Sequence, residues 1–163
     1  MVSIFNDVIG PVMRGASSSH CAAALRIGRL ARDLMGEDIT HILIEFDTNG
    51  SLPNTHESQG SDMGLFGGLL GWDAADERLP RSDAALKAAG TTVEIKYIDC
   101  HDPHPNTYRL TLTNAREQHT MIAISTGGGM IEVLEIDGQK VSMDGGSREE
   151  FAGRVLNPVL PVL

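Results

Sequence analysis

Cysteine and aromatic residues are both scarce in this 163-residue chain. The two cysteines, Cys21 and Cys100, are too few for a disulfide framework or for a cysteine-rich metal site. Aromatic residues make up 4% of the sequence, so aliphatic side chains and methionine must form the hydrophobic core. We therefore expect no metal ligands in this chain.

Positive charge and long apolar runs are also lacking. The formal net charge of −9 repels phosphate backbones and anionic lipid, so we expect neither nucleic-acid nor membrane binding. No apolar run approaches the roughly 18 residues that span a bilayer. Residues 1–10 have no basic region followed by an apolar stretch, as a secretory signal would. The expected location is the cytoplasm of a bacterium.

The remaining composition is typical of a globular protein, with 41% hydrophobic and 21% charged residues. The length fits one domain, which we place at residues 1–154. Residues 155–163 form an apolar tail with two prolines. This tail either docks on another chain or continues into a further domain.

The hydrophobic pattern predicts helices early in the chain and adjacent strands late. Helical spacing covers 21–35, 63–70 and 81–89, whereas 48–61 is polar and is typical of a loop. Alternation predicts strands at 41–47, 91–98, 108–113, 120–125, 130–136 and 139–143. This order predicts an α+β fold, with helices packed on a mixed, largely antiparallel sheet.

The first candidate site is the run Ser17, Ser18, Ser19 and His20 at the start of the first predicted helix. The first N–H groups of a helix have no partner within it, and the helix dipole is positive there. Such a place binds an anion such as a carboxylate. The alternative is a simple N-cap. Because three serines and a histidine exceed what a cap needs, we weigh the two interpretations equally.

The second candidate site is Gln59, Gly60, Ser61 and Asp62, where a polar loop leads into the next predicted helix. These residues offer further hydrogen-bond donors and a carboxylate to the same site. Taken alone, this segment is better explained as a surface loop with an Asp cap.

The third candidate site is His104 and Asn106, which alternate with Pro103 and Pro105. A metal site here would need a third ligand, and none is evident nearby. A histidine and an asparagine held by prolines can instead bind a substrate or transfer a proton.

The fourth candidate site is the glycine run between two predicted strands, where Ser125 is followed closely by Gly127 and Gly128. Consecutive glycines let a ligand or another chain approach the backbone closely. The Lys-Ser/Thr pair of a phosphate-binding loop is absent. The alternative is a bend in the sheet.

In this order, the four segments resemble the β chain of the iron–sulfur L-serine dehydratases, and the resemblance covers roughly residues 3–137. It rests on Ser-Ser-Ser-His at 17–20, Gly-Ser-Asp at 60–62, His-Pro-Asn-Thr at 104–107 and Ser-Thr-Gly-Gly-Gly at 125–129. It implies a fold like the allosteric substrate-binding domain of phosphoglycerate dehydrogenase. It also implies conversion of L-serine to pyruvate and ammonia by a homo-oligomer. A 4Fe-4S cluster would be held by a cysteine-rich α subunit or domain and not by this chain.

The resemblance also assigns roles to residues. His20 and His104 are the expected catalytic residues. The expected substrate-binding residues are Ser17, Ser18, Ser19, Gln59, Gly60, Ser61, Asp62, Asn106, Ser125, Gly127 and Gly128. In the family, the loop just before a Thr-Asp pair often carries a histidine that is associated with the catalytic base. Asp62 corresponds to the aspartate of that pair. Here Gln59 stands in that loop, and an amide cannot act as a general base. Either His20 or His104 takes that role, or the partner chain supplies the base, or the substrate differs.

Two other functions stay open at this point. The chain could be a stand-alone module that binds an amino acid or another small carboxylate. Alternatively, it could be a scaffold whose apolar tail mediates assembly.

Overall fold

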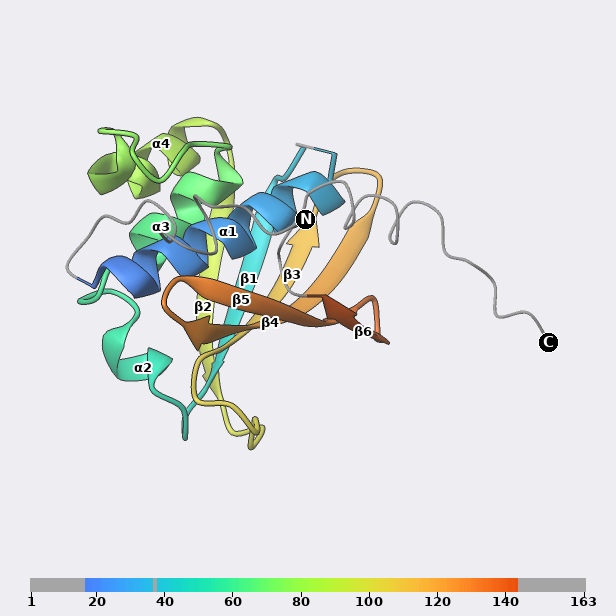
Figure 1. Ribbon diagram of the computed structural model, residues 1–163. Coiled ribbons are helices and arrows are strands. Elements are labelled where there is room, and N and C mark those ends of the chain that lie inside the picture. The colour runs from blue at the N-terminus through green and yellow to red at the C-terminus, as the bar shows by residue number, and fades with distance from the viewer. Residues whose placement is uncertain (1–16, 37, 144–163) are drawn as a thin grey trace.

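The computed structural model describes residues 17–36 and 38–143 as a layer of helices on one sheet (Figure 1). The helices are α1 (Ser18–Leu34), α2 (Leu52–Thr55), α3 (Ser61–Leu69) and α4 (Ser82–Ala88), with a 3-10 turn at Leu79–Arg81. The strands are β1 (His41–Asp47), β2 (Thr92–Ile98), β3 (Thr107–Thr113), β4 (Gln118–Gly127), β5 (Met130–Ile136) and β6 (Gln139–Met143).

The six strands form one sheet in the order β2-β1-β3-β4-β5-β6. β1 and β2 are parallel, and every other neighbouring pair is antiparallel. The predicted α+β fold with a mixed, largely antiparallel sheet is therefore confirmed. The likeness to the domain of phosphoglycerate dehydrogenase stays a prediction.

Alternation along the strands explains how the sheet acquires a buried face. In β1, Ile42, Ile44 and Phe46 are buried, and Leu110 and Leu112 continue the same face in β3. Successive strand residues point to opposite faces, so these side chains meet the helices while their neighbours turn away. Together with apolar residues of α1 and α3 they form the main hydrophobic core.

Helices α1 and α3 pack so closely that their backbones touch. A Cβ atom added to Gly64 would lie 2.1 Å from the carbonyl oxygen of Cys21, and one added to Gly68 would lie 2.1 Å from that of Leu25. Moving one turn along α1, from Cys21 to Leu25, moves the contact one turn along α3. The two helices therefore run parallel, and their N-terminal ends lie side by side.

The predicted elements are all present, although several boundaries shift: α3 begins two residues earlier than predicted, and β4 extends two residues further at each end. The first helix begins at Ser18, so Ser18, Ser19 and His20 lie inside its first turn. Residues 48–61, which we expected to be a loop throughout, include the short helix α2. A single turn of helix is too short to show a hydrophobic period, so the sequence gives no signal for it.

The predicted apolar tail, 155–163, lies outside the described residues, so the domain boundary at residue 154 stays a prediction. Within the described ranges, no helix is both long enough and apolar enough to cross a membrane.

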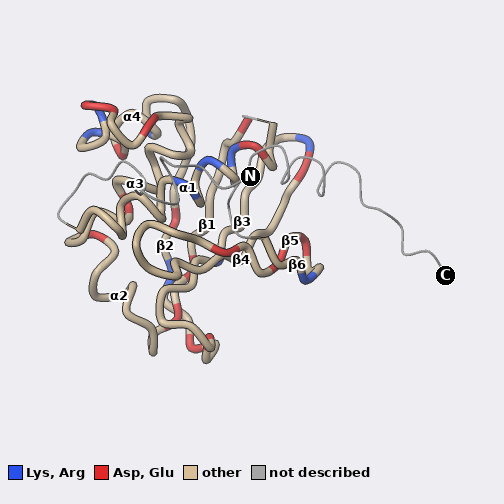
Figure 2. Tube along the Cα trace, in the orientation of Figure 1, with Lys and Arg blue, Asp and Glu red and all other residues tan. Residues whose placement is uncertain are grey.

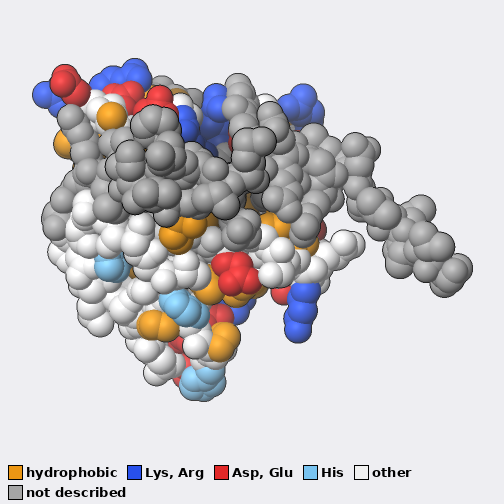
Figure 3. All heavy atoms as spheres, in the orientation of Figure 1, with side chains coloured by type: hydrophobic (Ala, Val, Ile, Leu, Met, Phe, Trp, Pro, Cys, Tyr) orange, Lys and Arg blue, Asp and Glu red, His pale blue; other side chains and the backbone are white. Residues whose placement is uncertain are grey.

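Acidic and basic residues are intermingled around α4 (Figure 2). Histidine side chains reach the surface at the end of the molecule where α2 lies (Figure 3).

Candidate functional site

The first and second candidate segments lie side by side in the structure. The backbone N–H of Ser17 donates to the carbonyl oxygen of Gln59 at 3.2 Å, which ties the start of α1 to the turn before α3. Because the two helices run parallel, their positive dipole ends point to the same place. Two adjacent helix starts form a stronger anion site than either start alone. We call this region, residues 17–20 and 59–62, the paired helix start.

The serines of α1 do not cap the helix in the simple way that the N-cap interpretation requires. Ser17 occupies the N-cap position, but its side chain makes no capping hydrogen bond. Its hydroxyl instead lies 2.8 Å from Nδ1 of His20. Ser18, Ser19 and His20 are half-buried in the first turn. The hydroxyl of Ser17 therefore orients the imidazole of His20.

Three polar atoms at or beside the paired helix start are buried without a hydrogen-bond partner in the part of the chain that the structure describes. They are Gln59 Oε1, Ser61 Oγ and the hydroxyl of Tyr108. Burial of an unpaired polar group costs about 1–3 kcal/mol. A polar group from outside the described chain, such as a substrate or a partner side chain, would recover that free energy.

Tyr108 is the most deeply buried of these groups. It comes from β3, has no exposed surface, and its ring packs edge-on against Phe46 with centroids 5.7 Å apart. Burial raises the pKa of Tyr108 to about 12, and the Ser61 hydroxyl, which lies close by without the geometry of a full hydrogen bond, acts in the opposite direction. The hydroxyl therefore stays protonated at neutral pH and is available as a donor.

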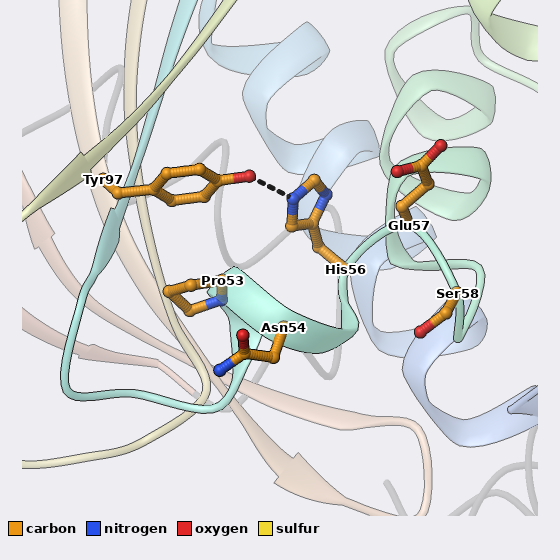
Figure 4. Close-up of a pocket in the computed structure, with 6 residues that line it drawn as sticks. All are labelled: Pro53, Asn54, His56, Glu57, Ser58 and Tyr97. Atoms are coloured by element: carbon orange, nitrogen blue, oxygen red, sulfur yellow. Dashed lines mark hydrogen bonds between the residues drawn. The ribbon is translucent and has the colours of Figure 1, made fainter.

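His56 is a site residue that the sequence did not reveal. Its Nδ1 lies 2.8 Å from both carboxylate oxygens of Asp62, and its Nε2 lies 2.8 Å from the hydroxyl of Tyr97. Burial raises the pKa of Asp62, whereas the hydrogen bond from His56 lowers it. Figure 4 shows the Tyr97 hydroxyl pointing toward the His56 ring. A histidine six residues before an aspartate in a polar segment was the available signal.

The third and fourth candidate segments also meet. The Ser51 hydroxyl donates to the side-chain oxygen of Asn106, and the Ser125 N–H donates to the Asn106 carbonyl at 3.1 Å. The Asn106 N–H in turn donates to Nδ1 of His104 at 3.1 Å. His104, Asn106 and Ser125 are therefore held together, at the start of β3 and the end of β4.

The two groups of residues are connected through α2. Thr55 donates from its hydroxyl to the carbonyl of Ser51 at 2.9 Å, and its own carbonyl accepts from the Gln59 N–H at 2.9 Å. Ser51 contacts Asn106, and Gln59 contacts the start of α1. This short chain of hydrogen bonds joins the paired helix start to the Asn106 group.

Gly127 and Gly128 are not drawn into either group. Both have positive φ angles, 101° and 60°, which suit glycine, but no described atom lies within 4 Å of a Cβ built on either residue. The turn is tied to α1 at its far end, where the Arg26 side chain donates to the carbonyl of Gly129 at 3.2 Å. The binding role of Gly127 and Gly128 stays a prediction.

A separate cluster of possible metal ligands lies at the end of β2. Ligand atoms of Asp47, Cys100 and Asp102 lie within 4.8 Å of one another. The Asp102 carboxylate is already paired with the Arg109 guanidinium at 2.5 and 3.0 Å. The Asp47 carboxylate accepts from the backbone N–H groups of Asn49 and Asp102. These protein donors account for the cluster without an ion.

The cysteines do not fit an iron–sulfur cluster, which is usually held by four thiolates. Cys21 is buried in α1, Cys100 follows β2, and neither forms a disulfide. Burial raises the pKa of both thiols. A buried thiol that resists ionisation is a poor cluster ligand, because thiolate is the form that binds metal. No chemistry of such a cluster is assigned to residues of this chain.

The sequence matches no established family profile, but it is similar to two known proteins. It is 40% identical over 143 residues to a Bacillus subtilis (strain 168) protein named probable L-serine dehydratase, beta chain; the match covers 88% of this chain and 64% of that protein. It is 32% identical over 142 residues to the L-serine dehydratase beta chain of Peptoniphilus asaccharolyticus, covering 85% of this chain and 63% of that protein. The chain thus spans a little under two thirds of the length of either relative. Over most of its own length, the chain is similar to two beta chains of L-serine dehydratase.

Proposed function

We propose that this chain acts as the β subunit of an L-serine dehydratase, which converts L-serine to pyruvate and ammonia together with a cysteine-rich α subunit. The similarity to two dehydratase beta chains supports the assignment. The observation that carries it is the hydrogen bond between Ser17 and Gln59, which joins two parallel helix starts beside buried polar atoms that lack partners.

In this proposal the paired helix start binds the carboxylate of the amino acid. The backbone N–H groups of Ser18 and Ser19 and the Ser61 hydroxyl provide the donors. Gln59 Oε1 is an acceptor and suits the ammonium group of the substrate. One end of the site therefore fits an anion and the other a cation, which is the pattern of an α-amino acid.

His20 and His104 are the candidate bases that the sequence offers, and the structure adds a reason for each. The Ser17 hydroxyl holds the His20 ring at the paired helix start. His104 accepts from the Asn106 N–H at Nδ1, so its Nε2 carries the proton when the ring is neutral. In this arrangement His20 is the better base, because it lies on the same helix turn as the proposed carboxylate donors.

The proposal assigns the 4Fe-4S cluster to the α subunit, because the two cysteines of this chain do not fit it. When bound there, the cluster supplies a Lewis acid for the departing hydroxyl group. The share of this chain is to bind the amino acid, orient it and receive a proton. The dehydratase would work in the cytoplasm as an oligomer.

The test is to produce the chain with an α subunit from the same organism, under anaerobic conditions, and to measure pyruvate formed from L-serine. We expect turnover by the pair and none by either chain alone. In the same assay, His20→Ala should abolish turnover, and His104→Ala should reduce it less. A pair that contains the cluster but releases neither pyruvate from serine nor 2-oxobutanoate from threonine would reject the proposal.

A second candidate function is a stand-alone sensor for a small amino acid. The three buried polar atoms without a described partner favour it, because a ligand could satisfy them in the absence of another chain. Calorimetry with L-serine and the single chain separates the two functions. Binding of L-serine to the single chain supports the sensor. Heat of L-serine binding that is observed only when the α subunit is present supports the dehydratase.

A further inference from the structure

We propose that Tyr97 is a positioning residue for the paired helix start, acting through His56 on the carboxylate of Asp62. The part of this inference that concerns substrate rests on the proposed function. The part that concerns the three side chains rests on their geometry alone.

Both ring nitrogens of His56 are engaged, and the partners fix their roles. Nδ1 lies 2.8 Å from both oxygens of the Asp62 carboxylate, so Nδ1 carries the proton. In the neutral ring, Nε2 is then an acceptor, and the Tyr97 hydroxyl at 2.8 Å donates to it. The Asp62 carboxylate can only accept, so it fixes the proton on Nδ1, and the Tyr97 hydroxyl holds the ring in that orientation by donating to Nε2.

The His56 ring has little room to move. Its side chain is only 9% exposed, and its ring centroid lies 5.2 Å from that of Phe46. Tyr97, which is paired with Phe46 across β1 and the edge strand β2, also packs near the ring, at a centroid separation of 6.0 Å. Loss of the Tyr97 hydroxyl therefore leaves the tautomer fixed by Asp62 but removes the hydrogen bond that orients the ring.

Asp62 is the link to the paired helix start, since it lies in the first turn of α3. A carboxylate in that turn is attracted to the positive dipole end of its own helix. There it would occupy the donors that a substrate carboxylate needs and would repel that carboxylate. Because both oxygens of the Asp62 carboxylate lie at hydrogen-bonding distance from Nδ1 of His56, the carboxylate points toward the imidazole instead. The Tyr97–His56–Asp62 chain thus keeps the anion site free.

Tyr97 itself lies apart from the paired helix start. It is 51% exposed and lines a pocket of about 410 Å³ with Pro53, Asn54, His56, Glu57 and Ser58 (Figure 4). In Figure 4 the hydroxyl is the part of Tyr97 nearest His56, while Glu57 and Ser58 lie on the far side of the His56 ring. Because the ring is exposed, Tyr97→Phe is expected to fold normally, so the hydroxyl can be removed without disturbing the core.

The direct test is nitrogen NMR of the imidazole in the full-length chain. In the wild type we expect neutral His56 to show one protonated nitrogen, Nδ1. Tyr97→Phe should leave Nδ1 protonated and move the Nε2 shift toward that of an imidazole nitrogen that accepts no hydrogen bond. Thr92→Val, which removes a hydroxyl from an exposed position of the same strand, should leave both nitrogen shifts unchanged. Identical His56 shifts in the wild type and Tyr97→Phe would overturn the inference, whether or not the chain is a dehydratase subunit.

The functional test uses the pair of chains and L-serine. Tyr97→Phe should raise KM about five-fold, the effect of one net hydrogen bond, with kcat nearly unchanged. In an Asp62→Asn background the same substitution should have no effect on KM, because no competing carboxylate remains. A fall in kcat without a change in KM, or an equal KM effect in both backgrounds, would contradict the positioning role. If even the wild-type pair is inactive, the proposed function fails, and the nitrogen shifts alone decide the role of Tyr97.

Discussion

Gly68 on α3 stands against the carbonyl oxygen of Leu25 on α1 with no room for a side chain, since a Cβ atom there would lie 2.1 Å from that oxygen. This contact and its equivalent at Gly64 set the parallel arrangement of the two helices. The parallel arrangement in turn brings Ser17 to Gln59. The geometry of the paired helix start therefore depends on glycines one to two turns away from it.

The first prediction concerns this helix contact. Gly68→Ala should lower the free energy of unfolding by at least about 2 kcal/mol, because backbone atoms cannot yield to the new methyl group. Gly67→Ala is the matched control on the same helix, since its Cβ would meet side-chain atoms of Leu79 and Trp72 rather than backbone. Urea unfolding of both variants measures the difference. Equal stability of the two variants would show that the backbones are not in contact.

The second prediction concerns the buried hydroxyl of Tyr108. Tyr108→Phe should leave the single chain as stable or raise its stability by about 1 kcal/mol, because an unpaired buried group is removed. The same variant should raise KM for L-serine in the pair, since a donor of the proposed site is lost. Thermal unfolding and pyruvate assays provide the two readouts. A marked loss of stability would mean that the hydroxyl has a partner within the folded chain.

The third prediction is the titration of the same residue. Burial raises the pKa of Tyr108 from 10 to about 12, so the folded chain keeps this proton more tightly than the unfolded chain does. The stability that this difference contributes is fully present below pH 10 and is lost as the pH rises from 10 to about 12. The tyrosinate absorbance of the wild type, measured against pH, minus that of Tyr108→Phe gives the pKa of Tyr108. An ordinary value, near 10, would contradict the burial.

The fourth prediction concerns the segment that leads to His104. Arg109→Leu should destabilise the fold by about 3 kcal/mol, because it leaves the Asp102 carboxylate buried and unpaired. The Asp102 side chain is only 3% exposed. Arg116→Leu is the control, since Arg116 pairs with Asp38 at the surface, where an ion pair contributes less than about 1 kcal/mol. A similar small effect at both positions would show that Asp102 is accessible to water.

Local patterns in the sequence predicted much of this fold. The alternation in 108–113 and 130–136 predicted strands that the structure confirms as β3 and β5. Between β5 and β6, Asp137 and Gly138 form the two-residue turn that an Asp-Gly pair favours, with φ angles of 51° and 77°. Each of these features depends on neighbouring residues, so a single sequence carries the signal.

The candidate site was less predictable, because its geometry depends on contacts between distant segments. The serines at 17–19 and the loop at 59–62 each suggested a helix start, but their meeting follows from glycine contacts within the two helices. His56 was missed because it lies in a segment expected to be an irregular loop, and its partner Tyr97 is distant in sequence. A hydrophobic pattern cannot show which polar side chains meet across a fold.

The central claim is that the paired helix start binds the carboxylate of the substrate. The most direct measurement follows backbone amide shifts of the isotope-labelled full-length chain, assembled with unlabelled α subunit, as L-serine is added. The account predicts that the largest changes occur together at the N–H groups of residues 18–20 and 61–63. Saturable changes elsewhere, with these amides unmoved, would contradict it.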